Sequence, residues 1–212
     1  MEPRVSRRGL ILGALAAPFV ANPAFAAIGS GFCPPRSGGY GGGAAGSDGY
    51  GSEPQEFDFS NVGVPTLTGT RTVYMRNVHT GESLAGEYLV DGQYVEGALQ
   101  AFNRFARDHR NGQEAIMSAG LLDIVSLLSE MLGTGTTPWN INSAYRSPSS
   151  NATVGGARNS LHMRGKALDI AHKSRSPSAV QGLARNLQMG GVGSYSSFTH
   201  VDTGQVRTWR PS

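Results

Sequence analysis

Two short segments near the end of the chain combine residue types that bind divalent metals. The first holds His162 and Asp169, and the second holds His200 and Asp202. Two imidazole nitrogens and one carboxylate oxygen suit a catalytic zinc ion, because three protein ligands leave the fourth tetrahedral position open for water. His162, Asp169 and His200 are therefore candidate zinc ligands.

The spacing of these residues allows them to meet at one ion. Asp169 follows His162 by seven positions, and Gly165 between them permits a sharp bend. A loop residue and a strand residue can thus converge, while His200 and Asp202 alternate and so share one face of a neighbouring strand. A single histidine in such a place is more often a hydrogen-bonded polar residue than a ligand, so spacing alone leaves both interpretations open.

Other catalytic arrangements fit these residues poorly. Ser160 and His162 lie close together but lack a nucleophile elbow, which disfavours a serine hydrolase. An H-E-x-x-H helix is absent, and His172 follows Asp169 by only three positions. Residues 190–193 are glycine-rich but lack the lysine and following helix of a phosphate-binding loop, so we expect a tight strand entry there.

The preceding segments predict a framework of strands and helices. β-Branched and aromatic residues bounded by turn signals indicate strands, and apolar residues that recur every three or four positions indicate helices. The apolar stripes of the helices should lie in the core, and His79 and His109 are expected in turns or solvent rather than at a metal. These patterns place two strands over 72–78 and 83–89 and two helices over 94–108 and 121–132.

The last third of the chain is expected to complete the domain. Residues 147–151 read as a turn, and residues 153–165 are too rich in glycine, asparagine and serine for a helix. The sum is an α+β fold in which helices pack on a small antiparallel sheet. The expected elements are strands over 141–146 and 167–170, a helix over 177–189, and a hairpin of 192–195 and 198–202.

The N-terminal residues read as an export signal. Arg7 and Arg8 precede an apolar run, and residues 23–26 read Pro-Ala-Phe-Ala, an A-x-A cleavage site. Paired arginines favour the twin-arginine route, so we expect residues 1–26 to be removed and the protein to reach the periplasm or cell envelope. An uncleaved anchor is disfavoured, because the apolar run is short for a bilayer core of about 30 Å.

Residues 27–65 are rich in glycine, serine and proline and are expected to form a flexible linker. Such a segment buries too little apolar surface to offset its ordering entropy. A single domain over 66–212 follows.

Cys33 is the only cysteine, so an intramolecular disulfide and a thiolate zinc cluster are excluded. We interpret it as a linker thiol, since Phe32 before it is too large for a lipid-attachment site.

The charge balance disfavours nucleic acid as a partner. Three of the 18 basic residues and one of the 15 acidic residues lie within residues 1–26, so the remainder carries a net charge of +1. No run of Lys and Arg interleaved with aromatics follows. We also expect no stable membrane span after processing, and no pattern indicates an oligomeric state.

Two motifs carry a resemblance to a known family. S-x-H-x-x-G-x-A-x-D is present at residues 160–169, and F-x-H-x-D at residues 198–202. At these residues the chain resembles the zinc peptidases of the D-alanyl-D-alanine carboxypeptidase superfamily, which includes lysostaphin-type and hedgehog-type zinc domains. The resemblance is closest to the YcbK-like branch of murein endopeptidases. It covers roughly residues 72–210 and extends to residues 77–82, 144–147, 190–193 and 202–209.

This resemblance implies a role for each site residue. His162, Asp169 and His200 would be the ligands of a zinc ion. Arg146 would stand where the superfamily keeps an arginine near the scissile carbonyl, and a guanidinium there can hydrogen-bond the developing oxyanion. The alternative for Arg146 is a turn residue that pairs with a surface carboxylate.

One position departs from the superfamily pattern. The carboxypeptidase members place Glu or Asp three residues before the second zinc histidine as general base, and this chain has Ser197 there. A serine hydroxyl cannot accept that proton, because its pKa is far too high. Asp202 is then either the base or a hydrogen-bond partner that orients a ligand histidine. Another group supplied by the fold, or binding without cleavage, remains open.

The resemblance therefore predicts a zinc-dependent peptidase that hydrolyses peptide bonds in peptidoglycan during cell-wall remodelling. Its partners would be stem peptides or cross-links, and the motifs do not reveal which bond is cut. The alternative is a zinc-stabilised module that binds peptidoglycan without cleaving it.

Overall fold

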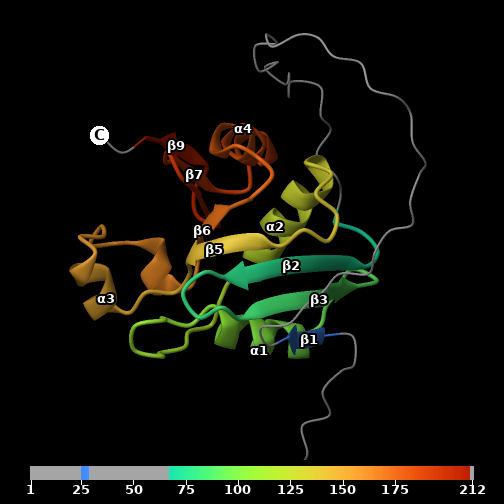
Figure 1. The fold of residues 1–212 in the computed structure, drawn as a ribbon, viewed down its shortest axis with the longest axis horizontal. Helices are drawn as coiled ribbons and strands as arrows, with labels where there is room; N and C mark the ends of the chain where they lie inside the picture. The colour runs from blue at the N-terminus through green and yellow to red at the C-terminus, as the bar shows by residue number, and fades with distance from the viewer. Residues whose placement is uncertain (1–24, 29–66, 211–212) are drawn as a thin grey trace, which may run out of the picture.

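The computed structural model describes residues 25–28 and 67–210, and its strands join in one sheet (Figure 1). The strands are β1 (Phe25–Ile28), β2 (Arg71–Asn77), β3 (Ser83–Val90), β4 (Gln93–Tyr94), β5 (Trp139–Ser143), β6 (Ala167–Ala171), β7 (Gly191–Ser194), β8 (Thr199–Asp202) and β9 (Arg207–Trp209). The helices are α1 (Glu96–Phe105), α2 (Gly120–Met131), α3 (Pro148–Thr153) and α4 (Pro177–Leu187), with a short 3-10 helix η1 (Leu161–Arg164).

The sheet is larger and more mixed than the small antiparallel sheet expected from the sequence. Its nine described strands follow the order β1-β3-β2-β5-β6-β8-β7-β9, and β4 pairs with β3. The β2–β5 and β7–β9 pairs are parallel, and the other pairs are antiparallel. Local patterns identify strands but not their partners, which is why the parallel pairs and the three-residue β9 escape a sequence-based prediction.

Most of the predicted elements are confirmed within a few residues. Both arms of the expected hairpin are present as β7 and β8, and the bounds of α2 and α4 agree with the predicted helices to within two residues. Helix α1 is shorter than the predicted 94–108, because Ala106 is its C-cap and Asp108 turns into the interior. Helix α4 ends where Gln188 adopts a left-handed backbone conformation, with φ of 52°.

Two short helices replace segments that were predicted to be irregular. Residues 147–151 were expected to form a turn, but Ser147 accepts a hydrogen bond from the Ser150 amide and caps α3, with proline at its first turn. Ser160 likewise accepts from the backbone amide of His162 at the start of η1, which ends at Gly165 with φ of 66°. The prediction of no helix within 153–165 is therefore wrong, since capping compensates for weak intrinsic propensity.

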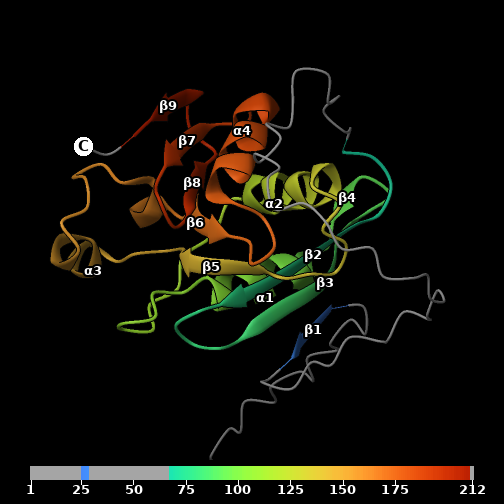
Figure 2. The ribbon, with the colours of Figure 1, turned by 45° about the horizontal axis from the view of Figure 1, so that its top comes forward.

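Three helices bury their apolar stripes against the sheet, as predicted. Helix α1 packs on β3, α2 on β2, and α4 on β7 and β8 (Figure 2). The buried residues of α1 are apolar at helical spacing, whereas α2 is buried continuously from Leu121 to Leu128. The same core includes Trp139 of β5 and Tyr88 of β3. This core fixes the strands on which the polar residues of the sheet stand.

The central strands β6 and β8 are buried on both faces and so separate the core from the polar residues. Leu168, Ile170 and Val201 lie in the apolar core, while the alternating positions Asp169 and His200 face the opposite side. The antiparallel register sets Asp169 directly across from His200. One row across the sheet therefore contains Ser143, Asp169, His200, Gly193 and Trp209.

The predicted signal peptide and linker fall outside the described residues except for β1, which pairs with β3. Cys33 also falls outside them. Within residues 25–28 and 67–210, no helix combines the length and apolarity needed to cross a membrane.

Candidate metal centre

The structure brings together the three candidate zinc ligands. His162 comes from η1, Asp169 from β6 and His200 from β8, and one donor atom of each lies within 4.8 Å of the other two. His162 Nε2 is 3.2 Å from His200 Nδ1 and 3.3 Å from Asp169 Oδ1. His200 Nδ1 is 2.9 Å from the same Asp169 oxygen.

These separations match the edges of a tetrahedral zinc site. Zinc binds nitrogen and oxygen at about 2.0–2.1 Å, so neighbouring ligands at tetrahedral corners lie about 3.3 Å apart. The three observed separations of 3.2, 3.3 and 2.9 Å lie near this value. The donor triangle thus has the size that one small divalent ion requires.

The outer hydrogen bonds of the two histidines determine which nitrogens are free to bind a metal. His162 Nδ1 lies 2.6 Å from the carbonyl oxygen of Ala144, and His200 Nε2 lies 3.1 Å from Asp202 Oδ2. Both partners are acceptors, so these outer nitrogens carry hydrogen, and in the neutral rings the inner nitrogens then present lone pairs. Two lone pairs and a carboxylate then face one point, an arrangement that a cation stabilises.

Without a cation, the buried charges shift the proton affinities of the cluster. Burial lowers the pKa of His162. Burial acts on His200 in the same direction, but hydrogen bonds to Asp169 and Asp202 outweigh it and raise the pKa of His200. Burial favours neutral Asp169, yet hydrogen bonds from His162 and His200 lower its pKa well below the usual range. A proton on His200 therefore competes with a metal for the site.

Asp202 lies behind His200 and does not line the cleft. Its carboxylate is fully buried and accepts hydrogen bonds from the backbone amides of Gly191 and Gly204 and from Arg207, whose Nη2 lies 2.8 Å from Oδ2. Although burial favours the neutral acid, hydrogen bonds from His200, Arg207 and the backbone lower the pKa of Asp202. Sequence reasoning overlooked Arg207, although its place shortly after Asp202 was part of the resemblance.

The glycine-rich residues 190–193 lead into and form most of β7, which agrees with the expected strand entry, and their missing side chains have a packing role. A Cβ on Gly193 would lie 2.7 Å from the Trp209 ring and 3.0 Å from His200 Cβ. Trp209 can therefore approach the His200 ring, with 5.0 Å between centroids. A Cβ on Gly191 would collide with Arg207 and the Asp202 carboxylate in the same way.

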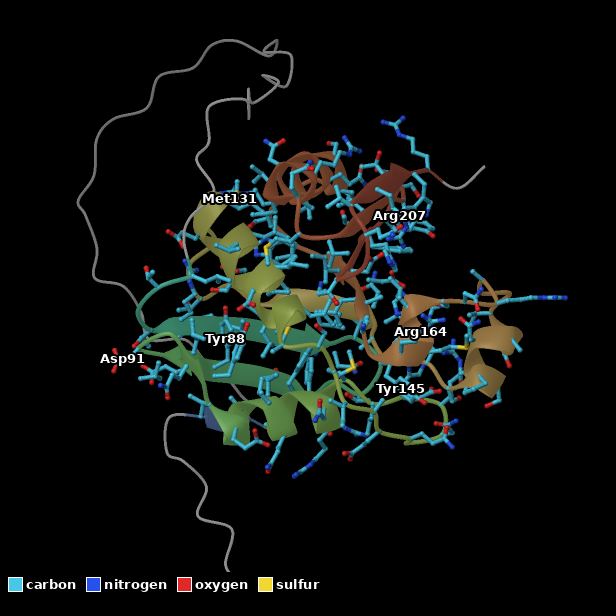
Figure 3. The ribbon with its side chains drawn as sticks, turned by 180° about the vertical axis from the view of Figure 1, so that it is seen from behind. Tyr88, Asp91, Met131, Tyr145, Arg164 and Arg207 are labelled. Atoms are coloured by element: carbon cyan, nitrogen blue, oxygen red, sulfur yellow. The ribbon has the colours of Figure 1, made fainter. Side chains whose placement is uncertain are left out.

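The donor triangle lies at the wall of a cleft of about 570 Å³. Figure 3 labels Arg164 of η1 and Arg207 of β9 at this end of the molecule, and Tyr88 and Asp91 at the other. The cleft-lining side chains beyond the triangle include two cations and several aromatic rings. They are Arg146, Arg207, Asn159, Ser160, Leu161, Tyr195, Phe198 and Trp209, with residues 154–157 completing the wall.

Arg146 reaches the triangle, as its predicted role requires. Its Nη2 lies 3.4 Å from Asp169 Oδ2, the carboxylate oxygen not directed at the histidines. Its buried Nε has no hydrogen-bond partner among the described residues. An unsatisfied buried donor is costly, so the described contacts of Arg146 leave part of its hydrogen-bonding capacity unused.

Ser197 is exposed and does not line the cleft. Among the cleft-lining residues that the structure describes, Asp169 is the only carboxylate. The general base of the carboxypeptidase pattern thus has no carboxylate counterpart among the described residues that line the cleft.

Sequence comparisons agree with this arrangement. Residues 66–209 match the family described as "Peptidoglycan L,D-endopeptidase MepK". The chain belongs to this family. It is 34% identical over 146 residues to "Peptidoglycan L,D-endopeptidase MepK" of Escherichia coli (strain K12), covering 66% of this chain and 80% of that protein. It is 35% identical over 147 residues to the probable MepK of Haemophilus influenzae, covering 66% and 79%.

A more distant relative carries a metal in its name. The "Zinc D-Ala-D-Ala carboxypeptidase" of Streptomyces albus G is 31% identical over 115 residues, which cover 50% of this chain and 45% of that protein. The expected membership in this peptidase superfamily is thereby confirmed. The His-Asp-His cluster is the feature of the present structure that suits a metal.

The remaining histidines of this MepK family member lie apart from the cluster. His79 and His109 stack on each other with 3.9 Å between centroids, and His79 Nε2 lies 2.9 Å from the carbonyl oxygen of Asn142. His172 is buried edge-on against Trp139, with 4.9 Å between centroids. None of the three belongs to the described group of side chains that could hold a metal.

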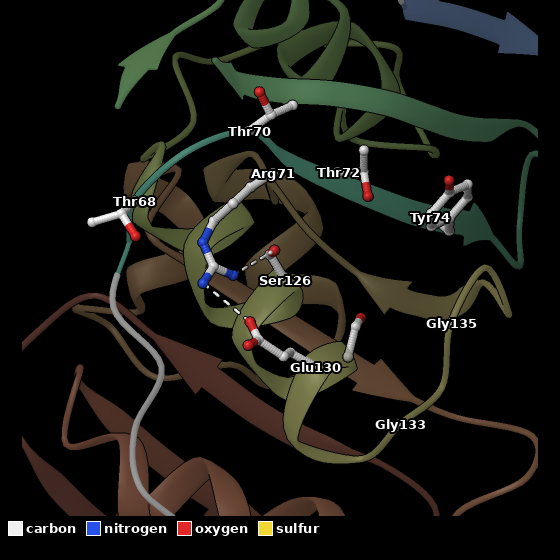
Figure 4. Close-up of a pocket in the computed structure, with 10 residues that line it drawn as sticks. Thr68, Thr70, Arg71, Thr72, Tyr74, Ser126, Glu130, Gly133 and Gly135 are labelled. Atoms are coloured by element: carbon white, nitrogen blue, oxygen red, sulfur yellow. Dashed lines mark hydrogen bonds and ion pairs between the residues drawn. The ribbon is translucent and has the colours of Figure 1, made fainter. Parts of the chain in front are cut away.

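A second hollow of about 660 Å³ is larger than the metal cleft but lacks its chemistry. It lies beside β2 and α2 and is lined mainly by hydroxyl side chains such as Thr70 and Thr72. Its guanidinium, that of Arg71, points to Glu130 and Ser126 (Figure 4). Since no histidine lines it, we assign no catalytic role to this hollow.

Proposed function

We propose that this protein is a zinc-dependent peptidase that hydrolyses peptide bonds in peptidoglycan. The observation that carries the proposal is the triangle of His162, Asp169 and His200 donor atoms at tetrahedral spacing, beside the unpartnered Nε of Arg146. Family membership supports peptidoglycan as the substrate, and the names of the relatives make L,D-peptide bonds the first linkage to test.

Each residue of the cleft would have a separate role in the hydrolysis. His162, Asp169 and His200 would hold the ion, which would polarise the scissile carbonyl and lower the pKa of a coordinated water toward about 7. Arg146 would donate hydrogen bonds to the carbonyl oxygen as it gains negative charge. Tyr195, Phe198 and Trp209 supply apolar wall that helps to hold the peptide and to exclude water.

For Asp202 we propose the orienting role, not the role of general base. Its carboxylate contacts the His200 nitrogen that points away from the other ligands, and it is fully buried. A base must reach the attacking nucleophile within hydrogen-bond distance, and this position does not favour that contact. The carboxylate would instead fix the His200 tautomer and strengthen the ligand.

The site of action proposed is the periplasm or cell envelope. The twin-arginine pattern with the A-x-A signal supports export, with residues 27–65 as a linker before the enzymatic domain. Peptidoglycan lies in that compartment, so export and substrate agree.

The second candidate function is a zinc-stabilised module that binds peptidoglycan without cleaving it, and one observation favours it. No carboxylate besides Asp169 lines the described part of the cleft, and Ser197 stands where related carboxypeptidases keep an acid. A binding module would retain zinc and bind peptidoglycan, yet release no peptide.

The experiment is digestion of purified peptidoglycan by the zinc-loaded protein, with mass analysis of the released fragments. The variant His162→Ala should abolish release, and His172→Ala, a buried histidine outside the cluster, is the matched control that should leave it intact. Release of cleaved cross-link peptides by the wild type, with loss only in the first variant, supports a peptidase. Binding without any release would favour the module.

A further inference from the structure

The guanidinium of Arg146 is held only loosely by its own contacts. Its one described ion pair, to Asp169, spans 3.4 Å, and its buried Nε has no described hydrogen-bond partner. A group that must meet a developing oxyanion needs a fixed position. That position must therefore come from the backbone segment that carries the side chain.

The segment 144–147 is held by hydrogen bonds to His162 on one side and to Ala106 and Asp108 on the other. The carbonyl oxygen of Ala144 lies 2.6 Å from His162 Nδ1, so the segment also steadies a candidate metal ligand. Three consecutive amides then donate hydrogen bonds in alternate directions. Tyr145 N donates to Ala106 O at 3.0 Å, Arg146 N to His162 O at 3.2 Å, and Ser147 N to Asp108 Oδ2 at 2.9 Å.

Asp108 is the side-chain anchor of this arrangement. It is fully buried, and Oδ2 accepts from the Ser147 amide and, at 2.7 Å, from the Ser147 hydroxyl. Oδ1 accepts from the Arg110 amide at 3.0 Å. The Ser147 hydroxyl is held further by Asn111 Nδ2 at 2.8 Å. The carboxylate thus clamps the residue that directly follows Arg146.

The anchor is itself rigid and charged. The backbone of Asp108 closes a turn, because its amide donates to Gln113 O at 2.9 Å and its carbonyl accepts from Gly112 N at 2.7 Å. Burial favours the neutral acid, but hydrogen bonds from Ser150 and Ser147 lower the pKa of Asp108 to about 2. Its negative charge also favours the charged form of Arg146, against the burial that lowers the Arg146 pKa.

We propose that Asp108 is a positioning residue for the peptidase reaction, which fixes Ser147 and thereby aims the Arg146 guanidinium at the metal cleft. The inference rests on the proposed function of Arg146 and adds a residue to it. Asp108 does not line the cleft, so it acts through Arg146 and not on substrate.

A double-mutant cycle tests this inference. The zinc-saturated full chain and its Asp108→Asn, Arg146→Ala and doubly substituted variants are compared by kcat and KM on soluble peptidoglycan fragments. We expect Asp108→Asn to lower kcat about tenfold with KM nearly unchanged, and Arg146→Ala to lower it about a hundredfold. In the Arg146→Ala background, Asp108→Asn should lower kcat by less than about twofold, because the two residues act as one unit.

Asp123→Asn is the matched control. Asp123 is also a buried carboxylate, but it accepts a hydrogen bond from Tyr94 and lies on α2 outside the cleft. Its replacement should leave kcat within about twofold of the wild type. A merely structural role of Asp108 would instead lower the folded fraction and the zinc content, with kcat per zinc-loaded molecule unchanged.

Each outcome decides the inference. Equal fractional losses from Asp108→Asn with and without Arg146 would overturn it and leave the proposed function intact. If wild-type protein is inactive, or Arg146→Ala retains full kcat, the proposed role of Arg146 fails and the inference with it. If Asp108→Asn does not fold, Ser147→Ala removes the 2.7 Å contact alone, and its kcat loss must again depend on Arg146.

Discussion

His200 Nε2 lies 3.1 Å from Asp202 Oδ2, on the side of the imidazole ring that faces away from His162 and Asp169. The same carboxylate is held by Arg207 at 2.8 Å and by two backbone amides. The buried Asp202 carboxylate is thus hydrogen-bonded to His200, a candidate metal ligand. Asp202 does not line the cleft. Its effect on the reaction should therefore pass through His200.

Asp202→Asn is predicted to weaken zinc binding about tenfold or more, because the amide no longer supports the charge that zinc induces on the His200 ring. Excess zinc should restore most of the activity. The measurement is the rate of peptidoglycan hydrolysis across a zinc titration. A loss of about a hundredfold at saturating zinc would instead identify Asp202 as the general base.

The three donor residues are predicted to bind one zinc ion per folded chain. His162→Ala and His200→Ala should each abolish stoichiometric zinc, since two ligands rarely retain the ion that three hold. Metal analysis of the purified variants measures this. His172→Ala is the control, because His172 is buried but lies outside the donor triangle. Full zinc in either of the first two variants would contradict the assignment.

The sequence was sufficient to predict the two strands that carry Asp169 and His200, because their signals are local, but not the short helix η1 that carries His162. Strands were expected over 167–170 and 198–202, and alternation along the second put His200 and Asp202 on one face; the structure adds that Leu168 and Val201 lie on the opposite, apolar side from Asp169 and His200. The register that sets Asp169 across from His200 could not be predicted, since it depends on packing between distant segments.

Other features depended on contacts that no local pattern reveals. Asp108 was assigned to the end of a helix, yet it is buried beneath Ser147, which lies 39 positions further along the chain. Arg207 acts on Asp202 only because the parallel pairing of β7 and β9 places it there. Residues that position other residues are therefore the part of a site most easily missed in a sequence.

Asp108 is also predicted to contribute to acid stability. Its folded pKa of about 2 lies below the ordinary value of 3.8, so the ionised form is favoured by folding. The stabilisation, about 2 kcal/mol, is present above pH 4 and is lost as the pH falls toward 2. Asp108→Asn should therefore lower the free energy of unfolding at pH 7, with the difference from wild type becoming small as the pH approaches 2.

Denaturant unfolding of metal-free protein between pH 7 and pH 2 measures this difference. Asp123→Asn is again the control, because burial raises the pKa of Asp123. Its contribution has the opposite sign, present at acid pH and lost as the pH rises. A constant difference between wild type and Asp108→Asn over the whole range would show that charge is not involved.

Gly193→Ala is predicted to disturb the metal centre without changing any polar residue. The new Cβ would lie 2.7 Å from Trp209 Cζ2 and 3.0 Å from His200 Cβ, closer than packed carbon atoms tolerate. Trp209 and His200 must then separate, at a cost of about 1–3 kcal/mol in stability. Zinc affinity and the tryptophan fluorescence of the protein should change together, since Trp209 moves while Trp139 stays buried in the core. Gly97→Ala is the control and should leave zinc affinity unchanged, because no atom lies within 4 Å of its Cβ position and alanine favours the helix there. Unchanged zinc affinity in Gly193→Ala as well would mean that Trp209 does not help to hold His200 in place.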